Sequence, residues 1–107
     1  MTRIRCKIEK SSFFIQARGH AEYAEVNRDI VCSAISCLLI TLASSLETIK
    51  DIDKEIKLDD GDASISVEVP YWRSMHIRIM FEFAARGLEM IAEAHPENVE
   101  FIAIESS

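Results

Sequence analysis

The sequence predicts an α+β fold: a mixed β-sheet that carries two helices, in the order β-β-α-β-β-α-β. Five short segments alternate apolar and polar residues with a period of two, which is typical of strands with one buried face. Two longer segments repeat apolar residues at helical spacing. A strong turn signal, Asp59-Asp60-Gly61-Asp62, separates two of the strand segments. Strand pairs separated by helices in this order indicate an α+β domain.

The first two alternating segments, residues 3–9 and 12–18, predict an N-terminal hairpin with a tight turn at Lys10-Ser11. Such a hairpin would bring Gly19 and the histidine after it to the end of a strand. Cys6 falls on the apolar side of the first segment. We interpret it as a small core residue and give it no chemical role.

The first helix is expected from Asp29 to roughly Ile49, and the second from Trp72 to roughly Ala94. Apolar residues cover more than one stripe of the first helix, so it should be central and buried on most sides, and its small residues could also pack against a partner subunit. Cys37 reads as core. Gly87 inside the second helix indicates close packing. The remaining strands are expected at residues 54–58, 63–69 and 98–104, with Ile56 and Leu58 as buried candidates and both faces of the last strand covered.

The length of 107 residues indicates a single domain, residues 1–107. We see no signal peptide and no apolar run long enough to span a bilayer, so no membrane role is expected. Three cysteines without a CxxC pair indicate neither a disulfide framework nor a zinc site, and a reducing cytoplasmic compartment is the simplest reading. No cofactor and no metal are expected. The formal net charge of −6 disfavours direct nucleic-acid binding and suits a basic partner.

The candidate site is a histidine–cysteine pair that flanks the predicted loop from Gly19 to Arg28. Asp29 is a good helix N-cap, which would place Cys32 in the first helical turn, among N–H groups without an intrahelical partner. That position favours the thiolate, the nucleophilic form, and a protonated His20 nearby would favour it further. Without the cysteine beside it, His20 would be interpreted as an exposed loop histidine with no role. By position alone, Cys32 could equally be a buried apolar thiol.

Two short motifs support this interpretation. The first is Gly19-His20-Ala21, and the second is Asp29-Ile30-Val31-Cys32, followed by Ser36. Cys32 lies twelve positions after His20. They resemble the ribosomal-processing cysteine proteases, small bacterial enzymes that remove an N-terminal extension from a large-subunit ribosomal protein. The motifs cover about a quarter of the chain, and the chain length and order of elements also fit.

The resemblance implies that His20 is the base and Cys32 the nucleophile of a catalytic dyad, and that the enzyme is a homodimer. Gly19, Asp29, Ser33 and Ser36 then match supporting or substrate-binding positions, and the substrate would be an extended, phenylalanine-containing segment of the ribosomal protein precursor. The chain departs from the family's usual pattern at two positions. It has Asn27 where the family usually has glycine, and Ser33 where alanine is more common. Asparagine tolerates positive φ, so the turn can survive.

The sequence therefore predicts a cysteine endopeptidase. Amides near Cys32 and Ser33 are the nearest candidates for binding the oxyanion, and Asp29 could cap the helix or orient His20. Two alternatives remain open: a non-catalytic ribosome-assembly or peptide-binding module, and a thiol redox sensor. The acidic turn lacks the spaced ligands of an EF-hand and reads as a solvated turn.

Overall fold

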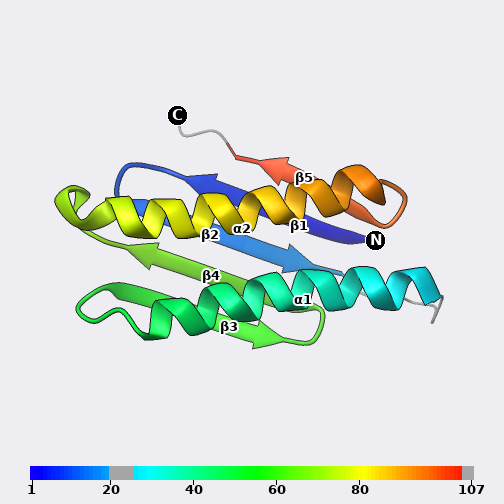
Figure 1. The fold of residues 1–107 in the computed structure, drawn as a ribbon, viewed down its shortest axis with the longest axis horizontal. Helices are drawn as coiled ribbons and strands as arrows, with labels where there is room; N and C mark the ends of the chain where they lie inside the picture. Colours follow the sequence, from blue (N-terminus) through cyan, green and yellow to red (C-terminus); the bar gives the residue numbers. More distant parts are fainter. Residues whose placement is uncertain (20–25, 105–107) are drawn as a thin grey trace.

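The computed structural model describes residues 1–19 and 26–104, and for residues 26–29 it describes the backbone alone. The element order matches the predicted one (Figure 1). The elements are β1 (Thr2–Ile8), β2 (Ser12–Arg18), α1 (Val26–Glu47), β3 (Asp53–Asp59), β4 (Asp62–Glu68), the 3₁₀ turn η1 (Tyr71–Arg73), α2 (Ser74–Ala94) and β5 (Val99–Ala103).

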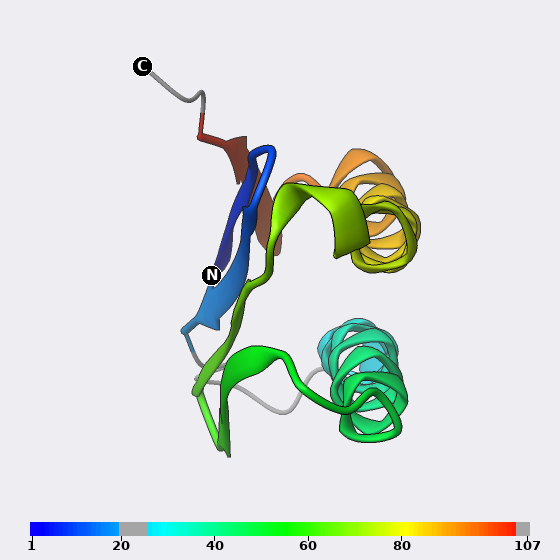
Figure 2. The same cartoon turned by 90° about the vertical axis from the view of Figure 1, so that its left-hand side faces the viewer.

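The five strands form one mixed sheet in the order β3-β4-β2-β1-β5. Only the β1–β5 pair is parallel; the other three pairs are antiparallel. Both helices lie side by side on the same face of the sheet, running in opposite directions (Figures 1 and 2). The molecule therefore has two layers, and the α+β prediction is confirmed.

The core fills the space between the sheet and the helices. Phe13 of β2 and Phe81 of α2 meet there with ring centroids 5.5 Å apart, and both side chains are almost fully buried. Close packing of the two helices centres on Gly87: a Cβ at this position would lie 2.9 Å from Leu38 Cδ1 of α1. The predicted reason for a glycine inside the second helix is therefore confirmed.

Several details of the prediction are wrong. Helix α1 begins at Val26, so Asp29 lies within its first turn and is not the N-cap. A carboxylate is favourable both at the cap and in the first turn, which is why the sequence signal was displaced by one turn. Cys37 is exposed on α1 and is not core. Leu58, near the end of edge strand β3, is 45% exposed.

Helix α1 is not central either, because a two-layer fold leaves its outer side uncovered. Its outward residues include Ile30, which is 62% exposed, and Ile40, which is 54% exposed. No helix that the structure describes lies over the far face of the sheet (Figure 2). Ile102 of β5 pairs with the exposed Arg5 of β1 and is itself exposed on that face. The expectation that both faces of the last strand are covered is therefore wrong for the described part of the chain.

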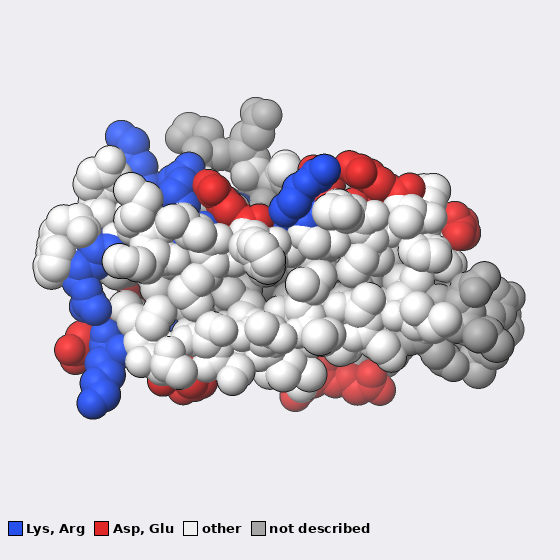
Figure 3. Space-filling model, in the orientation of Figure 1, with Lys and Arg blue, Asp and Glu red and all other residues white. Residues whose placement is uncertain are grey.

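The apolar character of α1 corrects the expectation that no apolar run is long enough to span a bilayer. Its segment Ile30–Glu47 is long and apolar enough to cross a membrane by length and composition, with a mean hydropathy of 1.9. One such helix is weak evidence, because core helices pass the same test. Leu39, Leu42 and Leu46 of this segment are buried in the core. We therefore interpret α1 as a helix that packs one side on the core and has a largely uncharged outer side. Figure 3 shows that outer helix face, where charged side chains gather mainly at the rim.

Candidate active site

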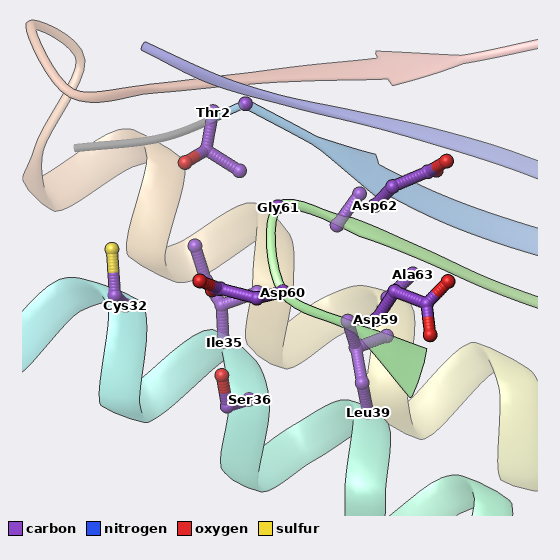
Figure 4. Close-up of a pocket in the computed structure, with 12 residues that line it drawn as sticks. Thr2, Cys32, Ile35, Ser36, Leu39, Asp59, Asp60, Gly61, Asp62 and Ala63 are labelled. Atoms are coloured by element: carbon purple, nitrogen blue, oxygen red, sulfur yellow. The ribbon is translucent and has the colours of Figure 1, made fainter. Parts of the chain in front are cut away.

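The thiol of Cys32 lies on the wall of a pocket between α1 and one end of the sheet. The pocket has a volume of about 120 Å³ and is bordered by α1, the end of β2 and the β3–β4 turn. Cys32 is half-buried. Figure 4 shows its sulfur pointing from α1 into the space between the helix and the strand ends. The thiol is thus accessible from the pocket and is not sealed in packed hydrocarbon.

The end of β2 is fixed beside this pocket by Gly19. Its φ of +126° is in a region that side chains rarely adopt, and a Cβ there would overlap the Met1 carbonyl oxygen. The Gly19 N–H donates a hydrogen bond to the Gly61 carbonyl at 3.1 Å, which ties β2 to the β3–β4 turn. The predicted turning role of Gly19 is confirmed, and the chain continues to His20 from this wall of the pocket.

The acidic β3–β4 turn is the part of the site that sequence reasoning missed. Asp59, Asp60, Gly61 and Asp62 all line the pocket, on the side facing α1. The interpretation as a mere solvated turn is therefore incomplete. The turn reaches the pocket because β2 pairs with β4 in a register that sets Arg18 opposite Asp62. The sequence predicts two hairpins but does not indicate which strand of one hairpin pairs with which strand of the other.

The three carboxylates of the turn differ in their partners. Asp62 accepts hydrogen bonds from Lys57 Nζ at 2.9 Å and from Arg18 Nε at 3.3 Å. The hydrogen bond from Lys57 is the main cause that lowers the pKa of Asp62, and the same contact raises the pKa of Lys57. Asp59 lies 3.8 Å from Lys57 Nζ. Asp60 forms no hydrogen bond or ion pair with any residue that the structure describes.

The other predicted site residues divide into three groups. Ser36, one turn after Cys32, is exposed and lines the pocket. Ser33 is exposed on α1 but does not line it. His20, like Asn27 and the Asp29 side chain, lies outside the residues whose side chains are described.

The early start of α1 changes two expectations about Cys32. As the seventh residue of the helix it is past the first turn, where the effect of the dipole is concentrated, so activation by the helix N-terminus is wrong. The amides of Cys32 and Ser33 are also inside the helix, where N–H groups bond to carbonyls four residues earlier. They are therefore not free donors for an oxyanion. An activated thiol here needs a neighbouring base.

No group of three or more His, Cys, Asp or Glu side chains suited to a metal ion occurs among residues 1–19 and 30–104. The other buried thiol, Cys6, lies on β1 and its pKa is raised to about 11 by burial. The described pocket therefore offers a thiol, a serine hydroxyl and carboxylates. A thiol is the strongest nucleophile of this set, so the pocket suits nucleophilic chemistry.

Comparison with known proteins decides between the remaining functions. The family model of the cysteine protease Prp matches residues 1–100. This chain belongs to the Prp family of cysteine proteases. The ribosomal processing cysteine protease Prp of Mycoplasma genitalium is 30% identical over 93 residues, which cover 87% of this chain and 90% of that protein.

Solved structures of similar fold agree with the family. The crystal structure of SMU.848 from Streptococcus mutans matches with a TM-score of 0.77 and 26% identity, over 99% of this chain and 96% of that one. The ribosomal processing protease Prp from S. aureus, in complex with a substrate peptide, matches with a TM-score of 0.76 and 17% identity, over 97% of this chain and 100% of that one. The Prp fold is thus shared across the whole chain.

Family membership confirms the predicted resemblance and the predicted class of enzyme, a ribosomal-processing cysteine protease of the Prp family. Neither the non-catalytic module nor the redox sensor is favoured. A Prp enzyme needs a reactive thiol, and of the three cysteines only Cys32 lines the pocket described above.

Proposed function

We propose that this chain is an endopeptidase that removes the N-terminal extension of a large-subunit ribosomal protein, with Cys32 as nucleophile and His20 as base. The observation that carries the proposal is the accessible Cys32 thiol at the pocket between α1 and the end of β2. Gly19, the residue before His20 in the sequence, lines the same pocket. The family match supplies the class of reaction.

In this mechanism His20 accepts the proton of Cys32, and the sulfur attacks the carbonyl carbon of the scissile peptide. The tetrahedral intermediate collapses when the imidazolium gives its proton to the leaving amine, which leaves a thioester on Cys32. Water, deprotonated by His20, then hydrolyses the thioester and restores the thiol. Asp29 would orient His20 in this scheme, and Ser36, on the pocket wall, would contact the bound peptide.

The substrate is inferred from charge and from relatives. Ribosomal proteins are typically basic, and this chain carries a net charge of −6, which favours their encounter at low salt. The S. aureus relative has been crystallised with a substrate peptide and with a covalently linked product peptide. By analogy, the substrate here is an extended, phenylalanine-containing segment of the ribosomal protein precursor.

The decisive experiment incubates the purified protein with the ribosomal protein precursor and follows its mass. Wild type should release the N-terminal extension, whereas Cys32→Ser should lower kcat by at least about a thousandfold, because hydroxyl is a far weaker nucleophile than thiolate at neutral pH. His20→Ala should lose most of the rate. Cys37→Ser, a change of an exposed thiol outside the pocket, is the matched control and should cleave normally. Normal turnover by Cys32→Ser would refute the proposal.

We further propose that the enzyme is a cytoplasmic homodimer. Its three cysteines are free, which suits a reducing compartment. The outer helix face carries few charges (Figure 3), so two copies with a net charge of −6 can meet there with little repulsion. A groove of about 350 Å³ between α1 and α2 lies beside Phe83, which is 78% exposed, and could take the partner's aromatic ring.

Sedimentation at micromolar concentration tests this interface. Wild type should sediment as a dimer, and Phe83→Glu should shift it to monomer, because two carboxylates would be buried in an apolar contact. Ile102→Glu introduces the same charge on the opposite, uncovered face of the sheet and should leave the dimer intact. A dimer that survives Phe83→Glu but not Ile102→Glu would place the interface on the sheet instead.

A further inference from the structure

We infer that Asp60 is a specificity-determining residue: its carboxylate binds a cationic side chain, lysine or arginine, that the substrate carries close to the scissile bond. This inference rests on the proposed function, because it concerns how the same pocket selects its peptide. It assigns a role to a side chain of the β3–β4 turn, which lines the pocket opposite α1.

The pairing within the turn singles out Asp60. Asp62 is held by Lys57 and Arg18, and Asp59 lies near the same lysine, so these two carboxylates are already balanced by cations of the protein. Asp60 is exposed and has no such partner among the residues that the structure describes. Of the three, it is the carboxylate whose charge is left for a ligand.

The direction of the side chain is the second step. In Figure 4 the Asp60 carboxylate points toward α1, on the side where Cys32 and Ser36 face the pocket, whereas the Asp62 carboxylate points away toward β2. Both Asp60 and Cys32 line the same pocket. A peptide whose carbonyl reaches the sulfur therefore passes the Asp60 carboxylate.

Among the residues that the structure describes, no cation lines the pocket beside Asp60. Apart from the acidic turn, the residues that line it are uncharged: Thr2, Ala17, Gly19, Cys32, Ile35, Ser36, Leu39 and Ala63. Lys57 and Arg18, the two described cations that contact the acidic turn, are engaged with Asp62. An incoming lysine or arginine thus gains a charge-assisted hydrogen bond, while a glutamate at the same place meets only like charge.

The test uses the full-length enzyme and a peptide that spans the scissile bond of the precursor. In a set of variants, each residue within three positions of that bond is replaced in turn by lysine, glutamine or glutamate. Wild type should prefer lysine over glutamine at one position by about 2- to 5-fold in kcat/KM, mainly through KM, since an exposed charged pair contributes modestly. Asp60→Asn should abolish this preference, and Asp60→Lys should invert it toward glutamate.

Glu55→Gln is the matched control. It also removes one negative charge, but from a residue of β3 that does not line the pocket. It should keep the lysine preference, which separates a local contact from a change in net charge. The inference is overturned if Asp60→Asn retains the preference. It is equally overturned if Asp60→Asn slows all peptides by one factor and shifts the pH profile, because that result would mean that Asp60 acts on His20 and not on substrate.

A binding measurement keeps the two proposals distinguishable. The inactive Cys32→Ala enzyme should bind the lysine peptide about 2- to 5-fold more tightly than the glutamine peptide, and the double variant with Asp60→Asn should bind both alike. If wild type cleaves by a Cys32-dependent route with no charge preference, only the inference on Asp60 fails. If Cys32→Ser cleaves normally, the proposed function fails, and equal binding of all peptides would then overturn the Asp60 inference as well.

Discussion

Cys6 and Cys32 are two thiols of one small domain with opposite surroundings. Cys6 lies in the middle of β1, flanked by Ile15 of β2 and Ala103 of β5, and is 5% exposed. Burial raises its pKa to about 11. Cys32 lies on α1 beside the end of the sheet, half-buried, with its sulfur facing a pocket.

The difference shows where this fold can support chemistry. In the middle of the sheet every neighbouring strand contributes a side chain to the same core layer, so a thiol there loses water and stays protonated. At the end of the sheet the strands turn away, and the β3–β4 turn and Gly19 leave a space over α1. A nucleophile needs the second environment, because only the thiolate attacks and it must be reached by substrate.

Thiol alkylation should measure this contrast with the largest effect. At pH 7.5, iodoacetamide should label Cys32 more than a hundredfold faster than Cys6. The rise in the Cys6 pKa from 9.0 to about 11 alone lowers its thiolate population about a hundredfold, and burial slows access further. The rates are read by mass spectrometry of tryptic peptides over time.

The exposed Cys37 is the internal reference for an ordinary surface thiol. If His20 activates Cys32, labelling of Cys32 should be faster than that of Cys37 despite its lower exposure, and His20→Ala should remove this advantage. In denaturant all three thiols should react alike. Labelling of folded Cys6 at the rate of Cys32 would contradict the contrast drawn from burial.

The same contrast explains which parts of the molecule could be predicted from sequence. Burial of Cys6 follows from strict alternation along β1, which is a local pattern. The motif around Cys32 predicted the family, which the family model confirms, whereas Cys32 as the nucleophile stays a prediction. Strand β2 was predicted at its observed bounds, Ser12–Arg18, because turn signals stand at both of its ends.

What could not be predicted depends on contacts between distant segments. The acidic turn reaches the pocket only because β4 pairs with β2, and no local signal encodes that pairing. Cys37 is exposed because both helices share one face of the sheet, which periodicity along α1 cannot show. The start of α1 was misplaced because Asp29 is as favourable in the first turn as at the cap.

Alanine substitutions at two glycines, one at the pocket and one between the packed helices, provide a second test of this contrast with a smaller expected effect. Gly19→Ala should destabilise the protein by about 2 kcal/mol, because its φ of +126° strains any side chain and the new Cβ would overlap backbone of Met1. The end of β2 must then move. Since a displacement of about 1 Å near the reacting groups can cost about a hundredfold in rate, kcat/KM on the precursor should fall by a similar factor.

Gly87→Ala is the control from the packed interior. Its Cβ would meet only the Leu38 methyl groups, which are side-chain atoms and can shift. Alanine gains about 1 kcal/mol in helix propensity, which offsets the cost of moving Leu38, so the urea midpoint should change little and kcat/KM not at all. Equal loss of activity in both variants would mean that the catalytic geometry depends on helix packing as much as on the end of β2. Loss of activity in Gly19→Ala alone, measured at a urea concentration where both variants remain folded, would mean that the catalytic geometry depends on the end of β2 at the pocket wall.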